Sequence, residues 1–247
     1  MKNYPTKEWL EKYEQIKNKL KPRSKLDEYF IRNKVCGKNI HILNMGNVNF
    51  PTGNIMVLDP LVYLTRHENP YFVSVPTGIF PLVAAVVEVE QEHFRYAAVK
   101  VNFNGAKVDY FVEALRGNEN IDNFEEGNFF GFNVDAGLGT IVDVKTRDAY
   151  CDFIEKWEKE NSDGNPYDDI FAKEFEKNYK INPKYQRKDG DWINYTIPGT
   201  DLSVPMFQSG FGDGVYPVYF GYDKNNNICQ AVIEFIDIEL AFGANDE

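Results

Sequence analysis

The hydrophobic residues nearest the N-terminus recur at helical spacing. Lysine and glutamate residues stand between the apolar positions, which are Trp9, Leu10, Tyr13, Ile16 and Leu20. Residues three or four apart lie on one face of a helix, so the spacing predicts an amphipathic helix over residues 6–20. Pro22 cannot continue this helix and ends the N-terminal segment, residues 1–22. We expect the apolar face of the helix to pack on the rest of the protein.

From residue 39 onward, many segments alternate with a period of two, which is typical of strands. In RYAAVKVNF, residues 95–103, one face would carry Ala97, Val99, Val101 and Phe103. VDYFVEAL, residues 108–115, alternates in the same way, and the turn sequence FNGA stands between the two segments. We therefore predict that they form a hairpin. KNIHILNMG and GNIMVLDP, residues 38–46 and 53–60, predict two further short strands around a turn.

Residues 71–89, YFVSVPTGIFPLVAAVVEV, are dense in β-branched side chains and predict a strand. Pro81 has no backbone N–H to donate, which places it at a sheet edge or at the start of the strand. FFGFNVD and GTIVDV, residues 129–135 and 139–144, predict two short strands joined by AGL. We therefore expect residues 79–143 to form consecutive antiparallel strands of one sheet.

The C-terminal run of residues 215–238 returns to strand, with DKNNN as a hairpin turn. This hairpin, over residues 215–237, should join the same sheet. Between the strand-rich parts, apolar residues at helical spacing predict a helical insertion around residues 147–180, with Thr146 as its cap. The predicted fold class is α+β, with a largely antiparallel sheet, an N-terminal helix and a helical insertion.

We expect the chain to form one globular domain over residues 1–247, whose body spans residues 39–247. Inside this body, GNIMVLDP and GTIVDV both run from a glycine through an apolar strand to an aspartate. Two glycine-led strands can match in this way by chance. The sequence alone therefore leaves an internal duplication open.

The overall charge narrows the classes of partner. The chain has 247 residues, carries a formal net charge of -11 at pH 7, and is 15% aromatic. An acidic protein is repelled by phosphate backbones and by anionic lipid surfaces, so we expect neither a nucleic-acid nor a membrane partner. The same charge permits a basic protein partner, because carboxylates on this protein can occupy the positions that nucleic-acid phosphates would take on such a partner. The oligomeric state leaves no mark in the sequence.

The cysteines and the apolar segments of the sequence indicate in which cellular compartment the protein is located. Cys36, Cys151 and Cys229 have the spacing of neither a zinc site nor a disulfide framework, so we expect reduced thiols. The N-terminal residues are charged throughout and contain no signal-peptide core. The longest apolar stretch, IFPLVAAVVEV, is too short to span a bilayer. These features predict a soluble, cytoplasmic protein.

Motifs for phosphates, dinucleotides and metals are missing from the sequence. GFGDG precedes a strand and not a helix, which argues against a dinucleotide fold. Asp223, Asn225, Asn227 and Glu234 stand at the spacing of a calcium loop, but Ile228 occupies the position that needs glycine. We expect neither a cofactor nor a metal.

Glycine-rich loops and strand-end aspartates are the strongest candidates for a functional loop. Glycines let the backbone of SGFGDG, residues 209–214, approach a ligand closely, and VDAGLG has the same character. The candidate residues are Asp59, Asp135, Gly137, Ser209, Gly212, Asp213, Gly214 and Tyr216. The alternative is structural, because aspartate also caps turns at the ends of strands.

The alternative between a functional and a structural role is clearest for Asp213. Backbone donors beside its two neighbouring glycines are unshielded by side chains. We therefore expect its carboxylate to accept hydrogen bonds from the amides of the Gly210–Val215 turn and so to fix the start of the next strand.

Five segments together resemble a known family. They are GNIMVLDPLVYL, VPTGIFPLVAAVV, RYAAVKVNF, FFGFNVDAGLGTIVDV and SGFGDGVYPVYFGYDKNNNICQAVIEF. On these residues, and above all on the intact strings V-D-A-G and G-x-G-D-G-x-Y-P, the chain resembles bacterial proteins catalogued as domain of unknown function 4241, over residues 50–240. The resemblance implies a bacterial, soluble, single-domain protein. It brings no catalytic residue, because the activity of that family is not established.

Three classes of function stay open. Acidity, abundant aromatics and the lack of a catalytic signature favour a non-catalytic interaction protein, such as an immunity-like or regulatory domain. A small-ligand binding module would use the glycine loops as the mouth of a pocket. A hydrolase or lyase would use Asp135 and Asp213 with a metal or water. Whether the protein is an enzyme is left undecided by the sequence.

Overall fold

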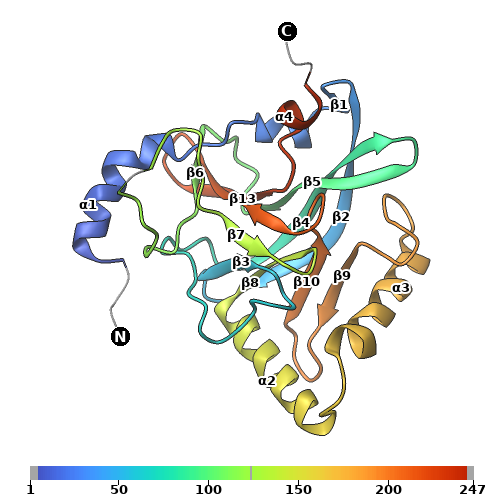
Figure 1. Cartoon of the computed structure of the whole chain (residues 1–247). Coiled ribbons are helices and arrows are strands. Elements are labelled where there is room, and N and C mark those ends of the chain that lie inside the picture. Colours follow the sequence, from blue (N-terminus) through green and yellow to red (C-terminus); the bar gives the residue numbers. More distant parts are fainter. Residues whose placement is uncertain (1–4, 123, 244–247) are drawn as a thin grey trace.

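The protein is an α+β structure built mainly from antiparallel strands, as the sequence predicts. The computed structural model describes residues 5–122 and 124–243. Within them, Figure 1 shows a large curled sheet beside two smaller ones. The strand orders are β1-β2-β4-β5-β13-β12-β6, β3-β8-β10-β9 and β11-β7. The helices are α1 (Lys7–Ile16), α2 (Val144–Glu160), α3 (Ala172–Ile181) and α4 (Ile238–Phe242).

The large sheet contains β1 (Lys34–Val35), β2 (Lys38–Phe50), β4 (Gly78–Glu90), β5 (His93–Asn102), β6 (Tyr110–Glu113), β12 (Val218–Tyr222) and β13 (Ile228–Glu234). The second sheet contains β3 (Ile55–Leu58), β8 (Leu138–Asp143), β9 (Trp192–Thr196) and β10 (Ser203–Gln208). The third pairs β7 (Phe132–Val134) with β11 (Gly214–Tyr216).

The N-terminal helix forms, but it is shorter than the expected span of residues 6–20: α1 ends at Ile16, a 3-10 turn follows over Lys17–Lys19, and Leu10 is exposed. The first turn of α1 is capped by Thr6, whose hydroxyl accepts a hydrogen bond from the Trp9 amide at 3.2 Å. The rings of Trp9 and Tyr13 stack with centroids 5.3 Å apart, and both meet the ring of Phe72 edge-on. Leu20 is buried in the same cluster, so the apolar face packs on the body of the protein.

The expected hairpin of residues 95–103 and 108–115 is wrong. β13 and β12 lie between β5 and β6 in the sheet. The two hydrogen-bonding edges of β5 are occupied by β4 and β13, and β6 pairs with β12 instead. β12 and β13 form the expected hairpin over DKNNN.

Residues 79–143 therefore do not form consecutive strands of one sheet, although every pairing is antiparallel. β4 and β5 are adjacent, but β7 and β8 lie in different smaller sheets. The predicted turn between β2 and β3 likewise joins strands of two sheets, and β2 is a long strand that pairs with β4. Pro81 is not at an edge; it lies near the start of β4, opposite Asn47, where the β2 register shifts.

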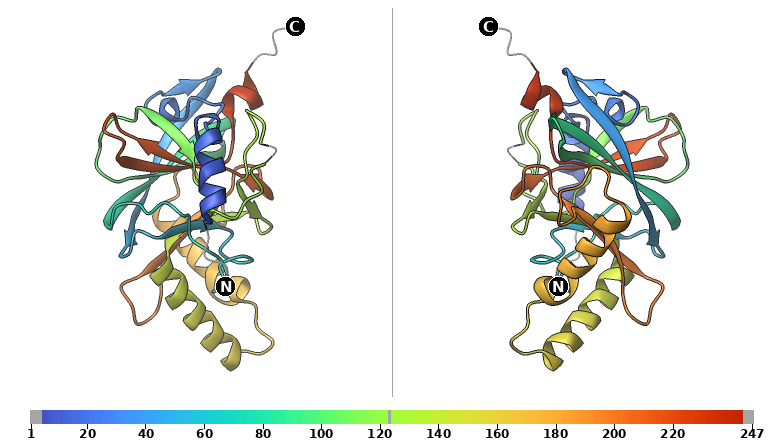
Figure 2. Two further views of the ribbon diagram at one scale, coloured as in Figure 1. Left: turned by 90° about the vertical axis from the view of Figure 1, so that its left-hand side faces the viewer. Right: turned by 90° about the vertical axis from the view of Figure 1, so that its right-hand side faces the viewer.

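The helical insertion covers the second sheet. Here α2 packs on β8 and β10, and α3 packs on β9, so both helices lie on one side of the molecule, away from α1 (Figures 1 and 2). The cap of α2 is Asp143 and not the expected Thr146, because Asp143 has the extended backbone of a cap and accepts the Lys145 amide at 2.9 Å. A one-turn π-helix, Tyr167–Phe171, leads into α3.

One cluster of buried hydrophobic residues runs through both large sheets, and a smaller cluster lies under α1. The three cysteines are thiols, of which Cys151 and Cys229 are buried and Cys36 is exposed. Across residues 5–122 and 124–243, each helix is too short or too polar to pass through a bilayer.

Candidate functional site

Two buried aspartates tie β3 and β8 together at opposite ends of the pair. Asp59 follows β3, is fully buried, and accepts hydrogen bonds from the amides of Leu61 at 2.9 Å and Val62 at 3.3 Å. Its other oxygen accepts the amides of Asp135 at 3.0 Å and Ala136 at 2.6 Å, which belong to the loop before β8. The carboxylate is thus occupied by backbone donors.

Asp143, at the end of β8, repeats this arrangement. One oxygen accepts the Thr52 amide at 2.9 Å and the Gly53 amide at 3.0 Å, in the loop before β3. β3 and β8 are antiparallel, with Ile55 opposite Asp143. Gly53 and Gly137 precede the two strands with left-handed φ of 72° and 66°, but the Gly53 amide donates to Asp143 and the Gly137 amide to Asp213. The glycine of the sequence echo, Gly139, lies inside β8.

The glycine loop of residues 209–214 lies against the loop that carries Gly137. Ser209 donates its amide to the Gly137 carbonyl at 3.1 Å and its hydroxyl to the Gly212 carbonyl at 2.8 Å. The Tyr216 hydroxyl donates to the same carbonyl at 2.6 Å. Gly212 has a φ of 116°, which a residue with a side chain rarely adopts. The two predicted loops are therefore brought together.

Asp213 does not bind the amides of its own turn. Its carboxylate accepts the amide of Gly137 at 2.9 Å, across to the neighbouring loop. The reason is the pairing of β10 with β8, which brings the two loops to the same end of the sheet, while Ser209 already takes the Gly212 amide. Gly214 lies in β11, opposite Val134.

The strand-end aspartates each make contacts with other protein groups. Asp59 and Asp143 are saturated by backbone donors, as described above, and Asp135 accepts a hydrogen bond from the Tyr63 hydroxyl. No cluster of three or more histidine, cysteine, aspartate or glutamate residues suited to a metal occurs in the described part of the chain.

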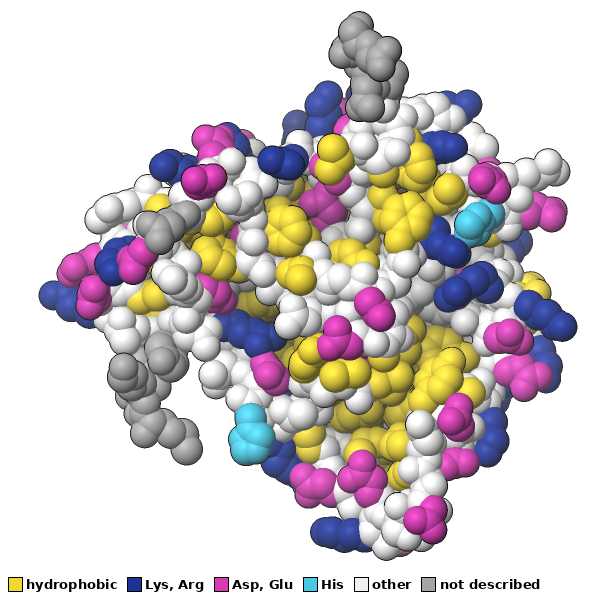
Figure 3. Space-filling view, in the orientation of Figure 1, with side chains coloured by type: hydrophobic (Ala, Val, Ile, Leu, Met, Phe, Trp, Pro, Cys, Tyr) yellow, Lys and Arg dark blue, Asp and Glu magenta, His cyan; other side chains and the backbone are white. Residues whose placement is uncertain are grey.

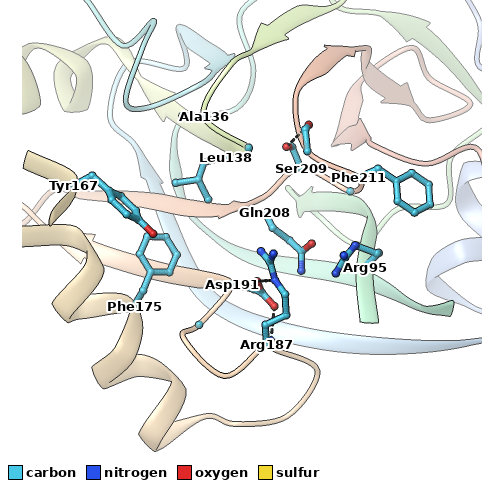
Figure 4. A pocket seen from close by; sticks show the side chains of 14 residues that line it. Arg95, Ala136, Leu138, Tyr167, Phe175, Arg187, Asp191, Gln208, Ser209 and Phe211 are labelled. Carbon is cyan, nitrogen blue, oxygen red and sulfur yellow. Dashed lines mark hydrogen bonds and ion pairs between the residues drawn. The ribbon is translucent and has the colours of Figure 1, made fainter. Parts of the chain in front are cut away.

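A cavity of about 260 Å³ opens beside the two glycine loops, between β5, the end of β10 and the segment leading to β9. Three of the predicted residues line it, namely Gly137, Ser209 and Gly212. In Figure 4, the side chains of Arg95, Arg187 and Gln208 point into the same space. We call this cavity the arginine pocket and define it by these last three residues.

Arg187 is held by a buried carboxylate. Its Nε lies 2.6 Å from Asp191 Oδ1, and its backbone amide donates to Asp191 Oδ2 at 2.6 Å. Asp191 is 1% exposed, whereas the Arg187 side chain is 60% exposed, so the guanidinium keeps donors directed to solvent. Tyr185 fixes the same loop by stacking on His41, with ring centroids 4.4 Å apart.

Arg95 and Gln208 complete the polar wall of the pocket. Partial burial lowers the pKa of the Arg95 guanidinium, and the positive charge of Arg187 lowers it further, against the opposite influence of Asp191. Gln208 is 2% exposed, and its Nε2 has no hydrogen-bond partner among the described residues. A buried amide donor without an acceptor is energetically costly.

The remaining wall is apolar. Leu138 and Phe175 are buried, while Tyr167 and Phe211 are 41% and 60% exposed at the rim. Figure 3 shows hydrophobic side chains exposed in a hollow above α2 and α3, with acidic and basic groups around it. A ligand in this place would meet charge on one side and aromatic rings on the other.

Sequence reasoning missed Arg95, Arg187 and Gln208. The two arginines lie in unrelated segments of the sequence, and only the fold brings them together. Gln208 carried a weak signal, because it is a polar residue at the end of the apolar run SVPMF and directly precedes the glycine loop.

The comparisons with known proteins give the family. Residues 48–233 match the family described as protein of unknown function (DUF4241), which covers most of the chain, and the chain belongs to it. The resemblance expected from the sequence is thereby confirmed. Neither a curated protein nor a solved structure matches the chain. The residues that define the arginine pocket all lie within the matched region.

Proposed function

We propose that the protein is a binding module for a small anionic ligand, which occupies the arginine pocket. The observation that carries the proposal is the convergence of two guanidinium groups and an unpartnered, buried amide donor on one cavity. All three groups are hydrogen-bond donors, and the cavity contains one carboxylate, Asp191, already held by Arg187. An anion is the ligand that such a set of donors recognises.

The charge of the pocket is opposite to that of the protein. The chain as a whole has a net charge of -11, yet Arg95 and Arg187 face each other here closely enough for Arg187 to lower the pKa of Arg95. A bound anion would relieve this repulsion. Guanidinium groups also offer paired donors that suit a carboxylate or a phosphate.

The apolar wall supports a ligand with an apolar or aromatic part. Phe175, Tyr167 and Phe211 surround the space beside the donors. At about 260 Å³ the cavity is below the usual ligand-pocket range of about 300–1,000 Å³, so it suits a small molecule. The ligand class is therefore a small organic carboxylate or phosphate monoester.

Binding is a better account than hydrolysis or lyase chemistry. A catalytic carboxylate needs a lone pair directed at substrate, but Asp135 accepts a hydrogen bond from the Tyr63 hydroxyl and Asp213 accepts one from the Gly137 amide. The Ser209 hydroxyl donates a hydrogen bond to the Gly212 carbonyl, and among the described residues no base accepts one from it. These contacts support structural roles for the two aspartates and for Ser209.

The test is a series of ligands that differ in charge, three of which share a benzene ring. Benzoate, phenyl phosphate, inorganic phosphate and the neutral benzyl alcohol are titrated into the protein and followed by amide chemical shifts. We expect shifts around Gly137 and Ser209 with the anions and none with benzyl alcohol. Comparison of benzoate with phenyl phosphate then separates carboxylate from phosphate recognition. Equal binding of benzyl alcohol would contradict the proposal.

A further inference from the structure

A second pocket lies between the segment before β1, α4 and the β12–β13 hairpin. Its volume is about 180 Å³. Glu234 of β13, Tyr219 of β12 and Phe235 are buried members of its lining. Asp237, at the cap of α4, also lines it. We call this cavity the Glu234 pocket.

Glu234 is a buried carboxylate with an unused acceptor. It is 6% exposed, and its Oε1 has no hydrogen-bond partner among the described residues. Burial raises the pKa of Glu234 to about 7; the Ser24 hydroxyl beside it acts in the opposite direction, and the nearby carboxylates of Asp237 and Glu239 raise the pKa further. Three carboxylates thus lie close together here, and a bound cation would neutralise part of their negative charge.

The basic residues at this pocket stand at its rim. Lys21 forms an ion pair with Glu126 at 2.9 Å. The Arg23 guanidinium lies against Gly127, so close that a Cβ there would come within 2.8 Å of Arg23 Nη2. Both groups are therefore directed to the segment of residues 126–127.

Three exposed hydrophobic side chains form a collar around the opening. Phe129, Val215 and Leu240 are 44%, 48% and 72% exposed, and all line the pocket. Figure 3 shows hydrophobic side chains beside acidic ones in the region of α4 and β13. The pocket therefore combines a carboxylate at its floor, aromatic walls and an apolar mouth.

We propose that the Glu234 pocket binds an alkylammonium group, with the ammonium against Glu234 and the alkyl chain between the aromatic walls. A charge-assisted hydrogen bond to Oε1 would satisfy the unpartnered oxygen. The ring faces of Tyr219 and Phe235 would add cation–π attraction and apolar contact.

Such a group can come from a free amine or from a lysine side chain of a protein. The exposed collar favours the lysine source, because a protein surface around the lysine would cover Phe129, Val215 and Leu240, whereas a free amine would leave them exposed. This source is a specific form of the basic partner expected from the net charge of -11.

The pH dependence follows from the groups around Glu234. The titratable and charged groups near it are Asp237, Glu239, Lys21, Arg23, Tyr29 and Tyr219. Burial raises the pKa values of both tyrosines, so they stay neutral below pH 8. An alkylammonium keeps its charge between pH 6 and 8, whereas Glu234 changes charge there because burial raises its pKa to about 7. The ionised fraction of Glu234, and with it the affinity for the amine, should rise about tenfold over this range.

The experiment titrates n-butylammonium, butan-1-ol and butyrate into the protein at pH 8, with amide chemical shifts as the readout. The variants are Glu234→Gln and, as the matched control, Glu113→Gln. Glu113 is also a buried carboxylate with its pKa raised to about 7 by burial, but its Oε1 accepts the amides of Phe130 and Gly131. A second arm compares N-acetyl-Leu-Lys-Leu-amide with the same peptide carrying norleucine in place of lysine.

We expect n-butylammonium to bind the parent protein and the Glu113→Gln variant alike, and Glu234→Gln about tenfold more weakly, since one charge-assisted hydrogen bond is lost. Tighter binding of the lysine peptide than of the free amine supports a protein source, and equal binding supports a free amine. Binding of butan-1-ol or the norleucine peptide at the same strength would overturn the proposal, as would no binding of either cation. If the Glu234→Gln variant does not fold, the proposal is tested by the affinity of the parent protein for n-butylammonium at pH 6 and pH 8. A rise in affinity supports the proposal, and an affinity that does not change with pH overturns it.

Discussion

The carboxylate of Asp213 accepts a hydrogen bond from the backbone amide of Gly137 at 2.9 Å. This contact joins two loops that are far apart in the sequence and that both line the arginine pocket. It acts together with the amide of Ser209, which donates to the Gly137 carbonyl. The aspartate of the glycine loop therefore positions a pocket wall.

The Asp213→Asn variant should be only slightly less stable than the parent protein. Asp213 is exposed, so solvent screens the single hydrogen bond that is weakened. We expect a loss below about 1 kcal/mol, which lowers the melting temperature by no more than about 2–4 °C. Thermal unfolding followed by circular dichroism measures this, and a fall of about 10 °C or more would show a larger structural role.

The Asp59→Asn variant should be far less stable. Asparagine presents an NH₂ group where one carboxylate oxygen accepts two backbone amides, so two charge-assisted bonds in a fully buried place are lost. We expect the free energy of unfolding to fall by about 3 kcal/mol or more. Urea unfolding of this variant beside Asp213→Asn provides the comparison, and equal losses would refute the distinction between the two aspartates.

Stability should fall as the pH rises from 5.5 to 8. Burial raises the pKa of Glu113 and Glu234 to about 7 in the folded protein, whereas an unfolded glutamate titrates near 4.3. The folded state thus holds these protons more tightly than the unfolded state does. The stabilisation that the two protonated glutamates give to the folded protein is therefore complete below about pH 4.3 and is lost as the pH rises through 7. The loss between pH 5.5 and 8 is on the order of 2 kcal/mol for each group.

The check on this pH dependence is urea unfolding at pH 5.5 and 8 for the parent protein and for the double variant Glu113→Gln/Glu234→Gln. The double variant should depend less on pH across this interval, because glutamine does not titrate. The same slope in both proteins would show that other groups set the pH dependence.

Association with a lysine-bearing protein partner should slow as salt is added. The net charge of -11 attracts a basic partner over a distance that salt screens to about 10 Å at 0.1 M ionic strength. Association rates measured by stopped-flow fluorescence at increasing salt test this. An association rate that does not change with salt concentration would count against electrostatic steering by the acidic surface.

Local signals in the sequence predicted part of the fold. The helix beginning at Lys7, the hairpin over residues 223–227 and the helical insertion each depend on residues close together in the chain. Strand pairing was predicted less well, because β5 and β6 carry no local mark that β12 and β13 lie between them.

The candidate site divides in the same way. Gly137, Ser209 and Gly212 were predicted because glycine-rich loops can be recognised from their own residues, and they do line a pocket. Arg95, Arg187 and Gln208 could not be grouped from the sequence, since only the folded chain brings them to one cavity. Asp213 was assigned to its own turn because its true donor, Gly137, belongs to another loop.

The most direct test of the anion-binding account is the affinity of the Arg95→Gln variant for phenyl phosphate and benzoate, measured by isothermal titration calorimetry. Among the ion pairs of the described residues none involves Arg95, so its removal leaves no buried carboxylate without a partner. The matched control is Arg32→Gln, which removes the same charge from an exposed pair with Glu28. We predict that Arg95→Gln weakens binding of the better ligand about 10- to 100-fold, the worth of one charge-assisted contact, while Arg32→Gln binds as the parent protein does. Unchanged affinity of Arg95→Gln, an equal loss in both variants, or no binding of either anion to the parent protein would contradict the account.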